Sequence, residues 1–191
     1  TTDIPSLNMV FYGDRGRGKK RTAELYCGIL HQFGLTVKDS FKIITKGEII
    51  SKDTNDTMKR IMRFFDDNKG GVIYIDWGER GISEEENKEE YSILSSIIRL
   101  IDENKRKLVV ILSLSERSMK EYSSTEGDML SSFPYSLHFP FLTLDDLWTY
   151  FSFLVSKEGY KTGKGLKEKV TAVLEDMSKK DNFAGRISIQ K

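Results

Sequence analysis

The stretch that decides the fold covers residues 6–22 and reads SLNMVFYGDRGRGKKRT. Residues 7–12 form a short apolar run of the kind that becomes a buried strand, and a helical pattern opens at Lys19. A glycine-rich loop, residues 13–18, lies between them. The order strand, glycine-rich loop, helix is the context that the phosphate-binding motif G-x-x-x-x-G-K-[ST] requires. The chain matches this motif except at its last position, where Lys20 replaces Ser or Thr.

The chemistry of the motif explains its residue types. Glycines let successive backbone N–H groups turn toward a phosphate, and the start of the helix adds the positive end of its dipole. Lys19 would place a charge between the outer phosphates, whereas the hydroxyl missing at position 20 is the group that would ligate Mg²⁺. The candidate phosphate-binding residues are Gly13, Asp14, Arg15, Gly16, Arg17, Gly18, Lys19, Lys20 and Arg21.

This loop is unusually basic, with five cations among the seven residues 15–21. In one interpretation the charge replaces Mg²⁺, so that ATP, ADP or another polyphosphate still binds and Lys20 stands where the metal normally sits. In the other, the site is empty and the cations face solvent or an acidic neighbouring subunit. We favour metal-poor anion binding, because a bound anion would relieve the repulsion between like charges.

Composition narrows the function classes. The net charge is +1, which predicts neither a nucleic-acid nor a membrane partner, and no apolar run is long enough to span a bilayer. Cys27 is the only cysteine, so the chain has no disulfide framework, and we expect a cytoplasmic location. His31 and His138 lack neighbours with ligand or triad spacing, and we assign them no chemistry. The chain starts just before a core strand and stops in a helical pattern, so we expect a domain of a longer protein.

Strand and helix patterns alternate along the first three quarters of the chain. Fully apolar strands separated by helices of about a dozen residues predict a three-layer α/β fold with a parallel sheet. After Phe141 only helical patterns occur, so we expect an α/β domain at residues 1–141 and a small all-α unit at 142–191. The expected strands are 7–12, 41–44, 72–76, 108–112 and 136–139, and the expected helices are 19–33, 56–67, 83–105, 118–122, 143–158, 166–178 and 183 onward, with a polar loop at 46–55.

With these pieces in place, the chain resembles the AAA+ ATPases, and within them the CbxX/CfxQ family, which includes red-type Rubisco activases and the stage V sporulation protein K. The resemblance implies a P-loop NTPase fold with a central P-loop strand in a five-stranded sheet, a helical lid, and usually a hexameric ring that uses ATP to remodel protein clients. The matching segments are SLNMVFYGDRGRGKK (6–20), GGVIYID (70–76), LVVILS (108–113), SSFPYSLHFPFLTLDDL (131–147) and FAGR (183–186).

The resemblance also implies roles for single residues. Asp76 corresponds to the Walker B aspartate, which holds the water shell of the magnesium and is the one metal candidate. Ser113 occupies the sensor 1 position. Arg186 corresponds to the sensor 2 arginine of the lid, which contacts the γ-phosphate.

Several working parts of the family are replaced. Trp77 stands where the family has the glutamate that activates water, and an indole cannot act as a base; Glu79, two residues on, is the alternative carboxylate. The family pattern R-S-R-F-P supplies arginine fingers, but residues 130–134 read LSSFP, with Ser132 in place of an arginine. The substrate-gripping aromatic of the pore loop has no counterpart at residues 51–54.

These losses predict a degenerate AAA+ module that no longer hydrolyses ATP. It would be a structural or regulatory domain of a larger CbxX/CfxQ-like protein or ring, with other AAA+ domains as partners in the same chain or in a homo- or hetero-oligomer. The alternative is an active AAA+ ATPase that binds and hydrolyses ATP to remodel a protein client. A third hypothesis is a nucleotide sensor that moves its lid through Arg186. A small-molecule kinase is disfavoured, because no arginine-rich substrate lid is present.

Overall fold

The computed structural model describes residues 6–51, 53–79, 83–104, 107–124 and 130–178. The chain divides into two compact units, which are described one at a time. The first unit comprises Thr1–Gly13 and Lys19–His138, and the second comprises Asp14–Gly18 and Phe139–Lys191. The glycine-rich loop therefore contributes to both units.

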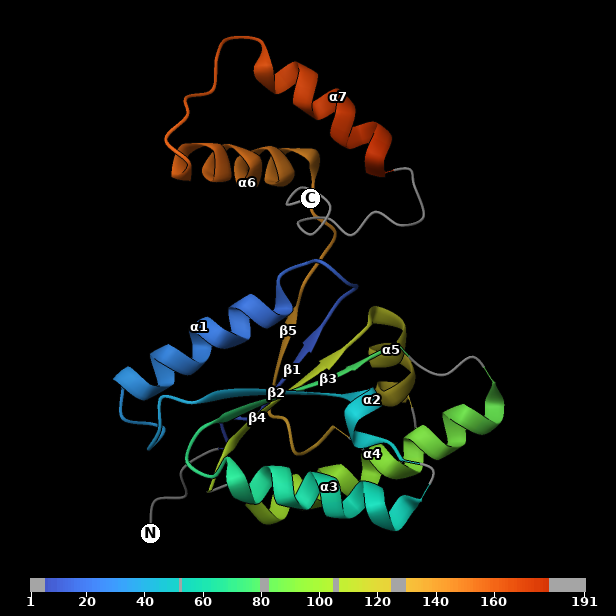
Figure 1. Ribbon diagram of the computed structural model, residues 1–191. Helices are drawn as coiled ribbons and strands as arrows, with labels where there is room; N and C mark the ends of the chain where they lie inside the picture. The colour runs from blue at the N-terminus through green and yellow to red at the C-terminus, as the bar shows by residue number, and fades with distance from the viewer. Residues whose placement is uncertain (1–5, 52, 80–82, 105–106, 125–129, 179–191) are drawn as a thin grey trace. The chain divides into compact units, whose positions relative to one another are not determined.

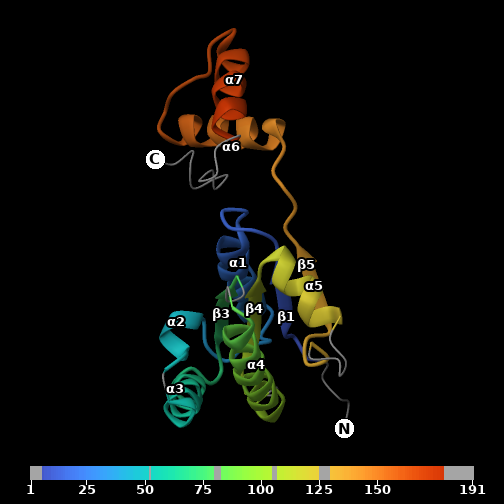
Figure 2. The ribbon, with the colours of Figure 1, turned by 90° about the vertical axis from the view of Figure 1, so that its right-hand side faces the viewer.

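The first unit is built on a five-stranded sheet in the order β2-β3-β4-β1-β5 (Figures 1 and 2). Every neighbouring pair of strands is parallel, as the apolar strand patterns predicted. The strands are β1 (Met9–Tyr12), β2 (Phe41–Thr45), β3 (Val72–Gly78), β4 (Val109–Leu114) and β5 (Tyr135–His138).

The P-loop strand β1 is an inner strand between β4 and β5, but the middle position belongs to β4. The expectation of a central P-loop strand is corrected to this extent. The expectation came from the family resemblance, and the apolar pattern could not test it, because burial on both sides marks every inner strand alike. The last strand, β5, lies at the edge of the sheet, and all four of its residues are exposed.

Helices cover both faces of the sheet and complete the predicted three layers (Figure 1). On one face α1 buries Ala23, Cys27 and Leu30. On the other face α3, α4 and α5 share one apolar core with the sheet. The helices of the first unit are α1 (Lys19–Gln32), α2 (Lys46–Ile49), α3 (Thr54–Asp67), α4 (Glu84–Asn104) and α5 (Glu116–Ser124).

Helix α2 lies where the sequence predicted a polar loop. The Thr45 hydroxyl accepts from the Glu48 N–H at 3.3 Å, and the Glu48 carboxylate accepts from the Thr45 N–H at 2.8 Å, which is a capping box. The Thr45 hydroxyl also donates to the Glu48 carboxylate at 2.7 Å, and this bond, together with the one from the Thr45 N–H, lowers the pKa of Glu48 below its usual value. The loop prediction was wrong because a helix this short shows no hydrophobic period, although its capping residues were readable.

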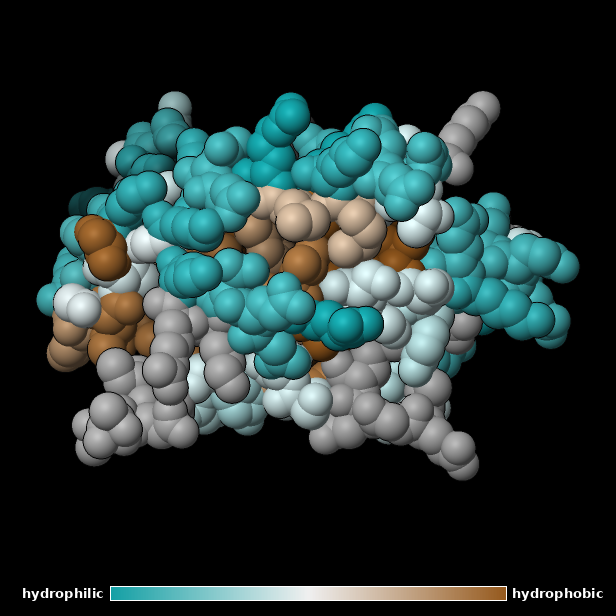
Figure 3. Space-filling view, turned by 90° about the horizontal axis from the view of Figure 1, so that it is seen from below, coloured by the Kyte–Doolittle hydropathy of each residue, from teal (hydrophilic) through white to brown (hydrophobic). Residues whose placement is uncertain are grey.

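The hydropathy of the molecular surface is consistent with helices that cover the sheet. Figure 3 shows one face that is mostly hydrophilic, with hydrophobic atoms exposed in a band between the polar side chains. On α3, Ile61 and Phe65 are fully buried, whereas Met62 is 49% exposed at the flank of the buried stripe. A hydrophobic residue at such a flank is common on soluble proteins and carries no functional weight alone.

The second unit contains α6 (Leu144–Lys157) and α7 (Leu166–Ser178), which pack against each other. Thr143 caps α6: its hydroxyl accepts from the Asp146 N–H at 3.1 Å, and the Asp146 carboxylate accepts from the Thr143 N–H at 2.9 Å. The helix expected from residue 183 lies outside the described residues. No helix in the described part of the chain is long and apolar enough to cross a membrane.

Candidate functional site

The glycine-rich loop has the backbone that its sequence demands. Gly13, Gly16 and Gly18 all have positive φ angles, of 140°, 82° and 95°. Side chains with a β-carbon rarely adopt such angles, so glycine is needed at each position. The Gly13 N–H donates to the Leu114 carbonyl at 3.2 Å, and the Lys19 ammonium donates back to the Gly13 carbonyl. The loop is thus curled over the first residue of α1.

The charges at this helix start favour an anion. The first turn of α1 contains no acidic residue and begins with Lys19, Lys20 and Arg21, although a helix N-terminus repels cations. Arg15 and Lys20 are exposed, and Arg21 pairs with Glu24 at 2.6 Å. An anion bound to the loop would offset both the crowded cations and the dipole.

Asp76 and Ser113 lie side by side at the carboxyl ends of β3 and β4, where they are register partners. Asp76 is exposed, whereas Ser113 is completely buried and its hydroxyl makes no hydrogen bond of normal geometry to the described residues. Both side chains share the α1 face with Tyr74, because alternate residues of a strand point to the same side. Burial raises the pKa of Tyr74. The Ser113 hydroxyl partly offsets this rise, whereas the negative charge of Asp76 adds to it.

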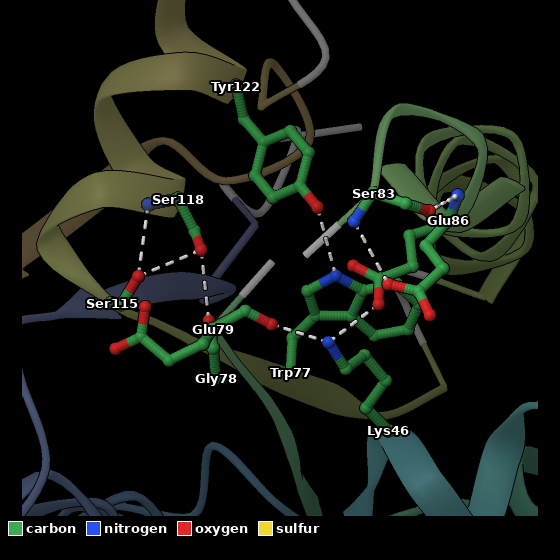
Figure 4. Close-up of polar contacts among 10 residues, drawn as sticks. Lys46, Trp77, Gly78, Glu79, Ser83, Glu86, Ser115, Ser118 and Tyr122 are labelled. Carbon is green, nitrogen blue, oxygen red and sulfur yellow. Dashed lines mark hydrogen bonds and ion pairs between the residues drawn. The ribbon is translucent and has the colours of Figure 1, made fainter. Parts of the chain in front are cut away.

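Trp77 faces the opposite side of the sheet from Asp76. Its side chain is only 1% exposed and belongs to the apolar core with Ile75, α4 and α5. The indole N–H donates to the Tyr122 hydroxyl at 3.1 Å (Figure 4). Beside it, the Ser118 hydroxyl donates to the Gly78 carbonyl at 3.0 Å and fixes the end of β3. The residue that the resemblance aligns with the family's catalytic glutamate is therefore a core residue.

The bond between Trp77 and Tyr122 gives a first testable prediction. Tyr122→Phe leaves the buried indole N–H without its acceptor, so we expect the free energy of unfolding to fall by about 1–2 kcal/mol. Urea unfolding of this variant, of Trp77→Phe and of the double variant measures the coupling between the two side chains. Additive losses would contradict the hydrogen bond.

A second polar cluster holds the segment that follows Trp77. The Lys46 ammonium pairs with the Glu90 carboxylate at 2.8 Å and donates to the Glu79 carbonyl at 2.5 Å. Glu79 is exposed, and its carboxylate points away from Trp77 and Lys46 (Figure 4). Sequence reasoning missed Lys46 and Glu90, because they lie 44 positions apart and no local pattern links them.

Ser132, which the resemblance aligns with an arginine finger of the family, is held inside the first unit. It is 6% exposed, and its hydroxyl donates to the Asp102 carboxylate at 2.8 Å. Its carbonyl accepts from the Asn8 amide at 3.4 Å. A residue anchored in this way does not project from the surface as a finger must.

Arg17 is buried and its guanidinium lies 2.5 Å from Asp14, so it differs from its exposed cationic neighbours.

His138, to which no chemistry was assigned, stacks on Tyr12 and lies 3.0 Å from Glu116 beside a cavity of about 360 Å³. Arg186 lies outside the described residues. Among the residues described, no group of three or more His, Cys, Asp or Glu could hold a metal ion.

The fold defines the class of protein. A parallel five-stranded sheet, a curled glycine loop between β1 and α1, and a following helical unit are the features of an AAA+ P-loop protein. The AAA domain of FIGL-1, solved in complex with ADP, matches this fold with a TM-score of 0.57 and 13% sequence identity, over 95% of this chain and 57% of that one.

Curated relatives of low sequence identity all come from one family of this class, although no family model matches the chain. Protein CbxX, chromosomal, of Cupriavidus necator is 26% identical over 159 residues, or 82% of this chain and 50% of that protein. Protein CbbX of Cereibacter sphaeroides is 21% identical over 190 residues, or 98% and 61%. Stage V sporulation protein K of Bacillus subtilis is 20% identical over 159 residues, or 82% and 48%.

These relatives confirm the predicted resemblance to AAA+ proteins of the CbxX/CfxQ type. The chain spans about half the length of the curated relatives that it matches.

Proposed function

We propose that this chain is an AAA+ module that binds ATP or ADP without hydrolysing it. It serves as a structural or regulatory domain of a larger CbxX/CfxQ-like protein or ring. The observation that carries the proposal is the burial of Trp77, which leaves the position of the catalytic glutamate inside the apolar core. The fixed Ser132 supports it, because a neighbouring site would receive no arginine from this position.

Three features support nucleotide binding. The loop glycines keep positive φ angles, Lys19 lies at the helix start, and Ser113 lies next to Asp76 at the carboxyl ends of β3 and β4. In this proposal the loop and Lys19 hold the phosphates, Arg15 and Lys20 supply outer charge, and Asp76 and Ser113 line the neighbouring strand ends. The ADP complex of the FIGL-1 AAA domain is consistent with this assignment.

The donor set does not suit Mg²⁺. Asp76 is the one carboxylate that the family pattern provides, and Lys20 brings a positive charge where the family has a metal-binding hydroxyl. We therefore assign the charge compensation to Lys20 and Arg15 and derive no step through a metal. The partners proposed are other AAA+ domains and, through them, a protein client, with residues 142–191 as the helical lid and Arg186 as its sensor 2 arginine.

A specific observation keeps the active ATPase as a second candidate. Glu79 is an exposed carboxylate just beyond Trp77, and its backbone is fixed by Lys46. If Glu79 activated water, turnover would be slow and would disappear in Glu79→Gln with folding unchanged.

Prolonged incubation with ATP and Mg²⁺ tests the proposal. We expect ADP to form no faster than in buffer for the wild type and for Lys20→Thr, which restores the metal-binding hydroxyl. Single-turnover chromatography with enzyme in excess over ATP detects even slow hydrolysis. ADP formation that Glu79→Gln abolishes would replace the proposed function with the second candidate.

A further inference from the structure

Arg17 differs from the other cations of the glycine-rich loop. Its side chain is only 5% exposed, and one guanidinium nitrogen lies 2.5 Å from the Asp14 carboxylate. The other nitrogen donates to the Phe139 carbonyl at 3.2 Å, and the guanidinium carbon lies 3.5 Å from the centre of the Phe141 ring. An ion pair, a hydrogen bond and a cation–π contact thus converge on one side chain.

These contacts join the loop to one particular segment. Residues 139–141 follow β5 and lead to Thr143, the cap of α6. The loop residues Asp14–Gly18 belong to the same compact unit as this segment and the two helices. The hydrogen bond from Arg17 to Phe139 joins residues that are 122 positions apart in the sequence.

The chemistry fits a tether better than a phosphate ligand. The planar guanidinium can stack on an aromatic ring while its N–H groups form hydrogen bonds in the guanidinium's own plane, which a lysine cannot do. Phe141 is 75% exposed, so its contact with Arg17 is not a by-product of burial in a core. The exposed Arg15 and Lys20 remain for an anion without disturbing this arrangement.

We propose that Arg17 tethers the glycine-rich loop to residues 139–141, so that occupancy of the loop is transmitted to the segment that leads into the helical unit. Asp14 orients the guanidinium, and Phe141 supplies the face on which it rests. When an anion reshapes the loop, the tether moves or strains the segment. The transmission rests on the proposed function, whereas the tether itself is a property of the ligand-free chain.

Amide hydrogen exchange of the peptide containing residues 139–143 tests the tether. Without ligand, we expect exchange of the Thr143 amide, which donates to the Asp146 carboxylate at 2.9 Å, to be about tenfold faster in Arg17→Ala than in the wild type, because release of the preceding segment makes local opening easier. Arg60→Ala is the matched control, because it removes an exposed arginine of α3 and changes the net charge by the same amount as Arg17→Ala. We expect it to leave exchange unchanged. Phe141→Ala removes only an exposed ring, so it keeps the test valid if Arg17→Ala does not fold, and it also speeds exchange.

The same measurement with saturating tripolyphosphate tests the transmission. We expect the ligand to change exchange at residues 139–143 in the wild type and not in Arg17→Ala, while the affinity of the variant stays within about threefold. Unchanged ligand-free exchange in both variants would overturn the tether. An affinity loss greater than about tenfold would overturn it too, by making Arg17 a phosphate ligand. If the wild type binds no tripolyphosphate, the transmission fails with the proposed function, and the ligand-free comparison still decides the tether.

Discussion

Trp77→Glu is expected to lower the free energy of unfolding by at least about 4 kcal/mol, the largest effect on stability that this structure predicts. The change removes a fully buried indole from the core beneath α4 and α5, and it deprives the Tyr122 hydroxyl of its donor. It also places a carboxylate among the apolar side chains of the core, and burying a charged group there is costly. Restoring the family's glutamate therefore damages the fold before it can restore catalysis.

Denaturant unfolding compares this variant with Trp77→Phe. The phenylalanine keeps an aromatic ring in the core and loses the hydrogen bond and part of the volume, so we expect a loss of about 1–2 kcal/mol. The difference between the two variants reports the cost of the buried charge. If Trp77→Glu proved as stable as Trp77→Phe, position 77 would reach water, and the argument against a catalytic base at this position would fail.

Lys19→Ala is expected to weaken the binding of ADP by about ten- to a hundredfold, because a charge-assisted contact to phosphate contributes roughly 1.5–3 kcal/mol. The Lys19 ammonium already lies over the loop, where it donates to the Gly13 carbonyl, so it is placed to move onto a phosphate. Titration calorimetry measures the change. Lys59→Ala, which removes an exposed cation of α3, serves as the control and leaves the affinity unchanged.

The same titration compares the contributions of Lys19 and Lys20 to nucleotide binding. Lys20→Ala is expected to cost less than Lys19→Ala, because Lys20 is exposed and supplies outer charge. Equal affinity in the wild type and in Lys19→Ala would mean that the glycine loop is not the nucleotide site. That result would leave the loop as a feature of the fold alone.

The parts that the sequence predicted well depend on local signals. Strand, glycine loop and helix follow one another within a few residues, and each glycine of the motif does take a positive φ angle. The apolar runs around Ile73 and Val110 predicted buried parallel strands, which β3 and β4 confirm. These features need no knowledge of distant neighbours.

Long-range arrangement explains what was missed. The Lys46–Glu90 pair, the Ser132–Asp102 bond and the Arg17 contacts with residues 139–141 all join positions far apart in sequence, so no local pattern could indicate them. The order of the inner strands is likewise set by crossovers and not by composition.

The face of the sheet toward which Trp77 points could in part have been predicted from the sequence. Ile73, Ile75 and Trp77 alternate along β3 and share the core, and the same alternation sends Asp76 to the other face. Applying this period beyond the end of the apolar run would have predicted that position 77 points away from Asp76. The sequence comparison with the family instead treated both positions as parts of one site.

Calorimetric titration of the chain with ADP and with ATP, in Mg²⁺ and again in excess chelator, tests the central claim most directly. We expect both nucleotides to bind with affinities that change by less than about threefold when the metal is removed, because Lys20 and Arg15 supply the charge that Mg²⁺ supplies elsewhere. Binding that requires Mg²⁺, or ATP that is recovered as ADP after the titration, would contradict the account and favour an active ATPase.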